Sequence, residues 1–190
     1  MQNIPPWKKQ LPMIATYARI LMAPVLVAIL MSPLPHAGLI AAVIFILTSI
    51  TDWLDGYWAR LYQAESAMGK FMDPIADKIL VLTVLILLLD AHKVDPIMVI
   101  LLLARDIFIG GLRSVAASNN VIIAAKPFGK WKTGFQMAAI PCLLVSDELF
   151  KDLSLHDIGY YGLWISVVLS LISGVEYTWG YYKNRPALNR

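Results

Sequence analysis

The chain has 190 residues, of which 58% are hydrophobic and only 15% are charged, and its mean hydropathy is +0.65. Soluble domains average about 45–50% apolar and about 25% charged residues, so this composition excludes intrinsic disorder and argues against an ordinary soluble domain. Cys142 is the only cysteine, which excludes a disulfide scaffold within the chain. An integral membrane protein remains, and we expect the net charge of +3 to reflect one side of a membrane rather than a nucleic-acid partner.

Six segments are apolar enough to be membrane helices, which need about 20 mostly apolar residues. They cover residues 11–31, 38–62, 74–89, 95–117, 132–145 and 157–182. The links between them are short, so we expect one all-α membrane domain over residues 1–190 with six transmembrane helices. Residues 1–10 contain Trp7, Lys8 and Lys9 and are predicted to be an interfacial anchor. A cleaved signal peptide is the alternative, but the apolar run is long and lacks a clean small-residue cleavage site.

Lysine and arginine are distributed asymmetrically over this layout. With the N-terminus inside, six spans place both termini inside, and only Lys93 and Lys151 of the 16 basic residues fall outside. Cytoplasmic loops carry the excess of Lys and Arg in membrane proteins. The sequence therefore predicts that both termini are cytoplasmic.

Four aspartates occur where the second expected helix ends and the third begins: Asp52, Asp55, Asp73 and Asp77. At about 100° per residue, Asp52 and Asp55 lie roughly 60° apart on one face, and Asp73 and Asp77 are one turn apart. A short turn lets the two faces converge, where four carboxylates would repel one another and would be costly to ionise near lipid. Two bound divalent cations would remove both problems. Oxygen ligands without His or Cys favour magnesium, calcium or manganese over zinc.

Small residues accompany the first two aspartates. Gly56 and Ala59 fall on the same helix face, which leaves a bare patch against which a nucleotide or diphosphate can lie. Arg60 is placed to meet a phosphate at the mouth of the site. A pair of metal ions in such a site typically clamps phosphate oxygens during displacement at phosphorus. Helix capping or packing would explain single members of this set, but not the whole set, which also includes Gly69.

The spacing of these residues resembles the signature of the CDP-alcohol phosphatidyltransferases. Asp52-x2-Asp55-Gly56-x2-Ala59-Arg60-x8-Gly69-x3-Asp73-x3-Asp77 matches every position of that signature. The resemblance implies the CDP-alcohol phosphotransferase fold, two divalent cations (Mg²⁺ or Mn²⁺), a CDP-linked lipid donor, attack by an alcohol hydroxyl with CMP leaving, and a homodimer. It also implies that the four aspartates are metal ligands and that Asp77 is the base that accepts the hydroxyl proton. Donor binding is then assigned to Asp52, Gly56, Ala59, Arg60 and Gly69.

The acceptor site is predicted from basic residues near the fourth and fifth helices. They are Arg105, Arg113, Lys126, Lys130 and Lys132. This excess of positive charge suits a phosphorylated alcohol, because arginine binds phosphate through paired hydrogen bonds. Thr16 and Arg19, three residues apart on the first helix, are candidates for lining the same cavity. Ordinary positive-inside loop charge and a snorkelling Arg19 are the alternatives.

Two segments, residues 105–113 and 125–136, resemble the phosphatidylglycerophosphate synthases within this family. Two positions depart from that subfamily: Asp106 stands where Glu is normal, and Gln10 where Asn is usual. The resemblance implies CDP-diacylglycerol and sn-glycerol 3-phosphate as substrates, in the lipid of a bacterial inner membrane with the active site facing the cytoplasm. Inositol phosphate, inositol, serine and phosphatidylglycerol remain alternative acceptors. A cation-coupled transporter is a distant alternative, because intramembrane aspartates often mark ion paths.

Overall fold

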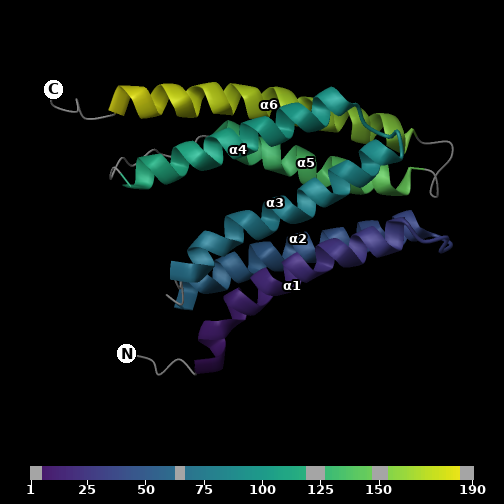
Figure 1. Ribbon diagram of the computed structural model, residues 1–190, viewed down its shortest axis with the longest axis horizontal. Coiled ribbons are helices and arrows are strands. Elements are labelled where there is room, and N and C mark those ends of the chain that lie inside the picture. The colour runs from purple at the N-terminus through teal and green to yellow at the C-terminus, as the bar shows by residue number, and fades with distance from the viewer. Residues whose placement is uncertain (1–5, 63–66, 119–126, 147–153, 185–190) are drawn as a thin grey trace.

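The computed structural model describes residues 6–62, 67–118, 127–146 and 154–184, and within them it leaves undescribed the side chains of 6–15, 52–62, 67–74, 77, 117–118 and 184. All regular structure in the described ranges is helical (Figure 1). The helices are α1 (Pro6–Leu30), α2 (Ala37–Tyr62), α3 (Ala67–Asp90), α4 (Pro96–Ser118), α5 (Pro127–Val145) and α6 (Leu155–Asn184). The prediction of an all-α chain with six helices is confirmed.

Proline sets the start of three helices. Pro6, Pro96 and Pro127 are the first residues of α1, α4 and α5. The missing N–H of proline costs nothing at this position, because the first N–H groups of a helix have no partner within the helix. The predicted start of the third helix at Pro74 is two turns late, since α3 already begins at Ala67. Proline is tolerated inside membrane helices where neighbouring groups satisfy the freed carbonyl, so Pro74 is no start signal here.

The end of α3 is closed by a Schellman motif. The backbone N–H of Lys93 donates to the carbonyl oxygen of Leu88 at 2.9 Å, and that of His92 donates to the carbonyl oxygen of Leu89 at 3.0 Å. His92 has a φ of 56°, the left-handed conformation that glycine usually supplies at this position. The motif satisfies carbonyls that the end of the helix leaves open.

Successive helices alternate in direction, so the start of α1 and the end of α6 lie at the same end of the bundle (Figure 1). We call this the terminal end, and the end that holds the links 31–36 and 91–95 the opposite end. α1 packs against α2 and α3, α5 packs against α6 and α2, and α4 packs against α6 and less extensively against α3. The predicted site residues that fall on helices lie near the middle of each helix or between its middle and the terminal end.

The interior of the bundle is filled by large aliphatic and aromatic side chains. Fully buried members include Leu26, Phe45, Leu85, Met98, Ile140 and Leu163. The helices α5 and α6 approach each other closely at Gly159, where a Cβ would lie 2.7 Å from Cγ of Leu143 and 3.0 Å from the carbonyl oxygen of Ala139. Only glycine allows this approach, which fixes the α5–α6 pair near the opposite end.

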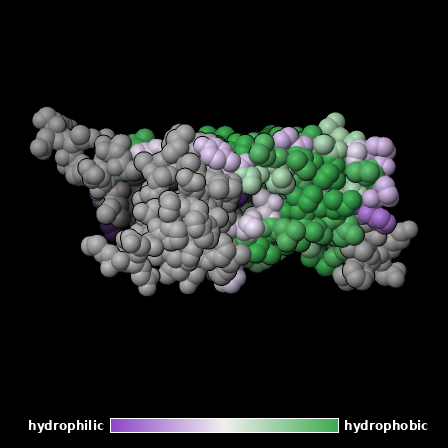
Figure 2. Space-filling model, turned by 90° about the horizontal axis from the view of Figure 1, so that it is seen from below, coloured by the Kyte–Doolittle hydropathy of each residue, from purple (hydrophilic) through white to green (hydrophobic). Residues whose placement is uncertain are grey.

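Apolar side chains also cover much of the outside. Exposed residues recur at spacings of three and four along α6: Ile158, Tyr161, Ile165, Val168, Ile172, Val175, Trp179 and Tyr182. Figure 2 shows hydrophobic residues over most of the described part of one face. Apolar surface of this extent is typical of a membrane or protein contact.

The described helices differ in how well they suit a membrane span. Leu155–Lys183 is long and apolar enough to cross a membrane by length and composition, and Thr16–Leu30 and Ala37–Thr51 are shorter apolar stretches. Among the residues that the structure describes, α6 is therefore the clear candidate span. Membrane association is supported, whereas the crossing of all six helices and the orientation of the termini stay predictions.

Candidate active site

The signature aspartates lie on two helices, in the half of each helix that is nearer the terminal end. Asp52 and Asp55 belong to α2, and Asp73 and Asp77 belong to α3. Because α3 begins at Ala67, the last two aspartates lie roughly two and three turns inside the helix rather than at its start. The accompanying positions Gly56, Ala59, Arg60 and Gly69 also belong to α2 and α3.

The side chains of this signature lie outside the described part of the structure. Among the described residues there is no group of three His, Cys, Asp or Glu residues that could hold a metal ion. Four carboxylates on the terminal-end halves of α2 and α3 are nevertheless a donor set that suits hard divalent cations. Their convergence and their role as ligands stay predictions.

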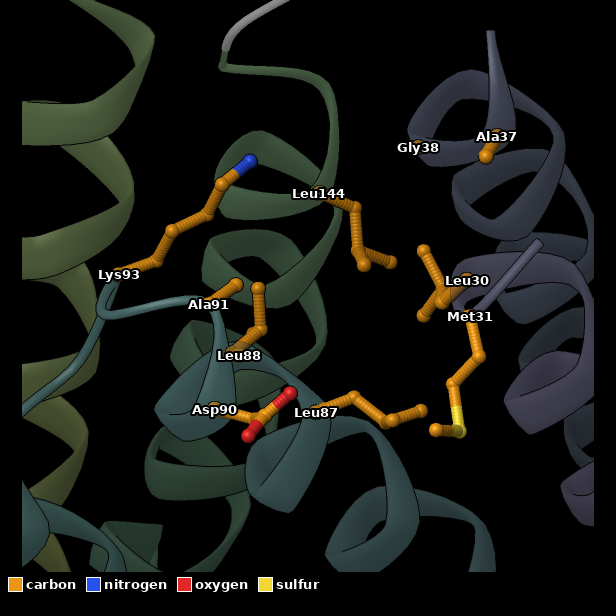
Figure 3. A pocket seen from close by; sticks show the side chains of 10 residues that line it. All are labelled: Leu30, Met31, Ala37, Gly38, Leu87, Leu88, Asp90, Ala91, Lys93 and Leu144. Atoms are coloured by element: carbon orange, nitrogen blue, oxygen red, sulfur yellow. The ribbon is translucent and has the colours of Figure 1, made fainter. Parts of the chain in front are cut away.

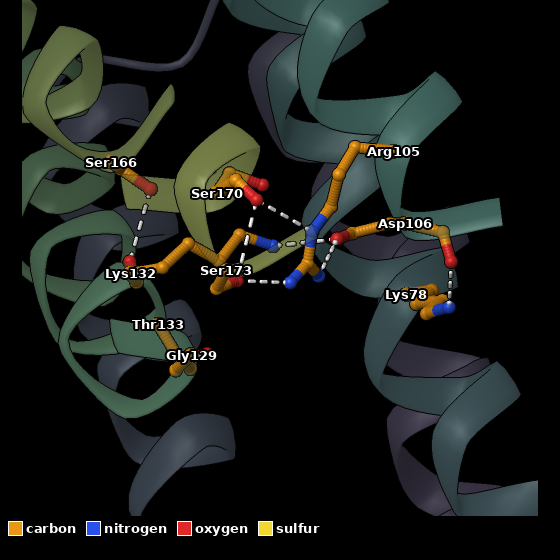
Figure 4. A network of polar contacts seen from close by, with 9 residues as sticks. All are labelled: Lys78, Arg105, Asp106, Gly129, Lys132, Thr133, Ser166, Ser170 and Ser173. Carbon is orange, nitrogen blue, oxygen red and sulfur yellow. Dashed lines mark hydrogen bonds and ion pairs between the residues drawn. The ribbon is translucent and has the colours of Figure 1, made fainter. Parts of the chain in front are cut away.

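The described part of the site is a buried ionic cluster around Asp106 of α4 (Figure 4). The Nζ atom of Lys132 lies 2.8 Å from Oδ1 and 2.7 Å from Oδ2 of Asp106, and Nη1 of Arg105 lies 3.0 Å from Oδ1. The Lys132 side chain is 7% exposed, that of Arg105 14% and that of Asp106 21%. Charges this far from water need partners, and the Asp106 carboxylate serves as the partner of both cations.

Arg105 is held against α6 by two hydrogen bonds. Its Nε donates to the carbonyl oxygen of Ser170 at 2.9 Å, and its Nη2 donates to Oγ of Ser173 (Figure 4). A Cβ at Gly174 would lie 3.4 Å from Cγ of Arg105, an ordinary van der Waals distance, so the arginine side chain lies close against α6 here. The guanidinium is therefore fixed in direction by two helices, α4 and α6.

Lys78 links α3 to the same cluster. Its Nζ donates to the backbone carbonyl oxygen of Asp106 at 2.7 Å. A Cβ at Gly110, one turn further along α4, would lie 2.9 Å from this Nζ. The absence of a side chain at Gly110 thus lets the ammonium group reach the backbone of α4.

Serine hydroxyls on α6 complete the described polar contacts. Oγ of Ser166, which is fully buried, donates to the carbonyl oxygen of Lys132 at 3.0 Å. Oγ of Ser170 is also buried, and it has no hydrogen-bond partner among the described residues. Buried hydroxyls are normally hydrogen-bonded, so Ser170 is one group in this cluster that a ligand could satisfy.

The structure brings together two of the predicted acceptor residues, Arg105 and Lys132. Arg113 is exposed, and its guanidinium carbon lies 5.4 Å from the centroid of the Tyr177 ring, in a cation–π contact. Lys130 is exposed on α5, and Lys126 lies outside the described residues. For these two residues the predicted role stays untested.

Thr16 and Arg19 are both buried on α1, with exposed fractions of 1% and 3%. That helix packs against α2 and α3, the two helices that carry the signature aspartates. Burial of an arginine argues against the alternative in which Arg19 snorkels to the membrane surface. Whether the pair lines the acceptor cavity stays a prediction.

Sequence reasoning missed the partners of the acceptor cations. The sequence marks Asp106 as an acidic residue on the inner side and as a departure from the subfamily pattern, and Lys78 as inside basic charge, but it names no partner for either. A signal for Asp106 was present, because a carboxylate inside an apolar helix requires a partner on another helix. The serines 166, 170 and 173 are also spaced by four and three residues, which places them on one face of α6.

A separate pocket of about 420 Å³ lies at the opposite end (Figure 3). Its lining is mostly aliphatic, with Asp90 and Lys93 as the charged members. Nζ of Lys93 donates to the carbonyl oxygen of Leu143 at 3.0 Å, so this amine already serves the local fold. With one carboxylate and one engaged amine, the pocket does not match a phosphate site, and we do not assign the active site to it.

Comparison with known proteins identifies the family that this chain is similar to. Residues 9–172 match the family model for CDP-alcohol phosphatidyltransferases. A CDP-diacylglycerol–glycerol-3-phosphate 3-phosphatidyltransferase from Rickettsia bellii (strain RML369-C) is 38% identical over 89% of this chain and 93% of its own length. A protein of the same name from Bacillus subtilis (strain 168) is 36% identical over 94% of this chain and 96% of its own length.

A more distant match carries a different name. It is a cardiolipin synthase (CMP-forming) from Oryza sativa subsp. japonica, 34% identical over 93% of this chain and 58% of its own length. All of these matches extend over most of the six helices, including α2 and α3 with the aspartate signature. The chain therefore belongs to the CDP-alcohol phosphatidyltransferase family.

Proposed function

We propose that this protein transfers the phosphatidyl group of CDP-diacylglycerol to sn-glycerol 3-phosphate, forming phosphatidylglycerophosphate and releasing CMP. The observation that carries the proposal is the similarity to relatives named for this reaction over about nine-tenths of the chain. The chain is an enzyme, a transferase of phospholipid biosynthesis. The physical features of the described site support the choice of acceptor.

The acceptor side of the proposed site is cationic and buried. Arg105 of α4 and Lys132 of α5 both donate hydrogen bonds to the carboxylate of Asp106. A phosphomonoester carries about 1.5 to 2 negative charges at pH 7. Arginine offers it a planar fork of N–H donors, and lysine offers a point charge. An acceptor without a phosphate would have little use for two buried cations.

The donor side is assigned to the signature on α2 and α3. Asp52, Asp55, Asp73 and Asp77 would hold two divalent cations, Mg²⁺ or Mn²⁺, and Gly56, Ala59, Arg60 and Gly69 would contact the CDP group together with Asp52. Bound cations would neutralise the diphosphate and the charge that develops on the leaving CMP. Divalent-cation dependence is general in this family.

In the proposed chemistry, Asp77 accepts the proton of the acceptor hydroxyl. The hydroxyl oxygen forms a bond to the phosphorus that carries the diacylglycerol, and the bond from this phosphorus to the CMP oxygen breaks. A carboxylate close to cations stays ionised at neutral pH and is therefore available as a base. The other three aspartates act mainly as ligands.

The membrane arrangement is part of the proposal. All six helices cross the bacterial inner membrane as one domain over residues 1–190, both termini and the active site face the cytoplasm, and residues 1–10 lie at the interface. The exposed apolar stripe of α6 supports contact with lipid. Lipid tails of the donor would stay in the bilayer, while the diphosphate reaches the polar groups between the helices. A homodimer is expected from the family.

A second candidate keeps the chemistry and changes the acceptor to phosphatidylglycerol. The similarity to the rice cardiolipin synthase favours it, since that protein is 34% identical to this chain. Inositol phosphate, inositol and serine are the further acceptors to be tested. A cation-coupled transporter would release no CMP, so one assay separates it from all of these enzymes.

The decisive experiment measures CMP release by the purified protein in detergent with CDP-diacylglycerol and Mg²⁺. The acceptors sn-glycerol 3-phosphate, inositol 1-phosphate, inositol, serine and phosphatidylglycerol are offered one at a time. We expect release with sn-glycerol 3-phosphate and its loss with EDTA. Release with phosphatidylglycerol alone would favour the second candidate, and no release with any acceptor would contradict the enzyme assignment.

A further inference from the structure

One residue of α4, Asp106, ties together the cationic half of the site. Its carboxylate receives hydrogen bonds from Lys132 of α5 and Arg105 of α4, and its backbone carbonyl receives one from Lys78 of α3 (Figure 4). Through Arg105 the cluster extends to the carbonyl oxygen of Ser170 on α6. Four helices therefore meet at a single residue for which the family signature names no role.

Among the four described side chains that form this cluster, positive charge exceeds negative charge. Lys78, Arg105 and Lys132 supply three positive charges, and Asp106 supplies one negative charge, which leaves an excess of two. The excess matches the charge of a phosphomonoester dianion.

The cluster also holds hydrogen-bond capacity that its own members do not use. A guanidinium has five N–H donors, and the described contacts of Arg105 use three of them. Oγ of Ser170 is buried and has no partner among the described residues. Both groups belong to the face where α4 meets α6, so an anion bound there would find donors from two helices.

We propose that Asp106 is a positioning residue for the acceptor: its carboxylate holds Arg105 and Lys132 in the arrangement that binds the acceptor phosphate, and its backbone links this pair to α3 through Lys78. Without the carboxylate, two like charges from α4 and α5 would repel each other, and the flexible lysine would lose its direction. Preorganised donors bind more tightly because less side-chain entropy is lost on binding. The proposal rests on the function proposed above.

The opposite role for Asp106 is also testable, and it predicts the opposite sign. A carboxylate that merely neutralised the two cations would compete with the acceptor phosphate for them. Its removal would then lower the KM for sn-glycerol 3-phosphate, whereas removal of a positioning residue raises it.

The test compares Asp106→Asn with Asp106→Glu in the full-length protein in detergent. CMP release is measured at saturating CDP-diacylglycerol while sn-glycerol 3-phosphate is varied. For Asp106→Asn we expect a KM raised about tenfold, the equivalent of one charge-assisted hydrogen bond, and a kcat changed by less than about threefold. Asp106→Glu keeps the carboxylate, and we expect it to restore the KM to within about threefold of the parent value.

A second pair of variants leaves the Asp106 carboxylate and its contacts with Arg105 and Lys132 in place. A Cβ at Gly110 would lie 2.9 Å from Nζ of Lys78, whereas a Cβ at the neighbouring Gly111 would meet nothing within 4 Å. Gly110→Ala therefore displaces a flexible amine from the carbonyl oxygen of Asp106 without touching the backbone packing. We expect this variant to raise the KM about threefold, and Gly111→Ala to leave it unchanged.

The outcomes separate the inference from the proposed function. If the parent protein releases no CMP with sn-glycerol 3-phosphate, the proposed function is wrong and this inference is wrong with it. If the parent is active and Asp106→Asn has an unchanged or lower KM, the inference alone is overturned. If Asp106→Asn does not stay folded in detergent, the Gly110→Ala and Gly111→Ala pair decides, and equal KM values in that pair would reject the link through Lys78.

Discussion

The middle of the bundle and its opposite end are held together by different physical means. In the middle, the ion pair between Lys132 and Asp106 has an N–O distance of 2.7 Å and side chains that are 7% and 21% exposed. At the opposite end, the contact between His156 and Asp157, which is an ion pair only when the imidazole is protonated, has a distance of 3.5 Å and side chains that are 46% and 63% exposed. The buried contact in the middle therefore contributes more to stability than the exposed contact at the opposite end, because water screens the exposed pair.

At the opposite end, close packing and backbone capping hold the helices together, whereas buried charges do so in the middle. Gly159 brings α6 against the backbone of α5, and the Schellman motif at His92 closes α3. Neither device needs a buried charge. Buried ion pairs are expensive to build, so their concentration in the middle indicates a site rather than a need for stability. The following predictions test this difference between the two regions.

The largest effect is expected from the signature aspartate that we assign as the base. Asp77→Asn keeps the size of the side chain and removes its basicity, and general-base catalysis contributes about 10²- to 10⁴-fold to a rate. We therefore expect kcat for CMP release to fall by at least about 100-fold. Asp90→Asn, at the opposite end of the same helix, is the matched control and should retain the parent rate. Equal rates for the two variants would remove Asp77 from the mechanism.

The next effect concerns the stability of the buried ion pair. Lys132→Met leaves the carboxylate of Asp106 without its closest cation, and breaking one side of a buried pair typically costs about 3–5 kcal/mol. His156→Ala removes the exposed pair, for which about 0–1 kcal/mol is expected. Equilibrium unfolding in mixed micelles, followed by circular dichroism, measures both. Similar losses for the two variants would contradict the distinction between the regions.

A packing change at the opposite end is expected to have a smaller effect. In Gly159→Ala the new Cβ would lie 3.0 Å from the carbonyl oxygen of Ala139 and 3.1 Å from the backbone nitrogen of Leu143, so the two helices must separate. Overpacking of this kind costs about 1–3 kcal/mol. Gly134→Ala on α5 meets nothing within 4 Å and should unfold like the parent protein or be slightly more stable. An unchanged unfolding midpoint for Gly159→Ala would mean that the close approach is absent in solution.

The smallest predicted effect is a gain in stability. His92 has a φ of 56°, which an L-residue with a side chain adopts at a cost, whereas glycine adopts it freely. His92→Gly should therefore raise the free energy of unfolding by up to about 1 kcal/mol, while His92→Ala keeps the strained backbone and should not. The same micelle titration detects the difference. A loss of stability in His92→Gly would show that the imidazole makes a contact worth more than the strain.

Much of the fold was accessible from the sequence, because six apolar segments separated by short polar links allow few arrangements. The helix starts were less accessible. Pro127 begins α5 and Pro74 lies inside α3, so the same residue type marks a start in one case and an interior position in the other. Proline is compatible with both positions, so residue type alone does not mark the start of a helix.

The candidate site was likewise predictable only in part. Arg105 and Lys132 were predicted as acceptor residues from their charge and position, and the structure places them on one carboxylate. The partner carboxylate was not predicted, since periodicity relates residues of one helix and says nothing about which helix faces which. Lys78 and the bare position at Gly110 belong to different helices and could only be connected by the fold.

The depth of Asp106 has a consequence for how the two substrates arrive. Asp106 lies near the midpoint of the 23-residue α4, so about 18 Å of helix separates it from the terminal end. In the proposed reaction the lipid donor diffuses laterally within the bilayer, whereas the small anionic acceptor must be drawn inward from the aqueous phase. Positive charge between low-dielectric walls focuses the electric field and speeds the capture of anions by about 10- to 1000-fold. Ionic strength would therefore change the rate at which the site captures sn-glycerol 3-phosphate. It would leave the rate of encounter with CDP-diacylglycerol unchanged.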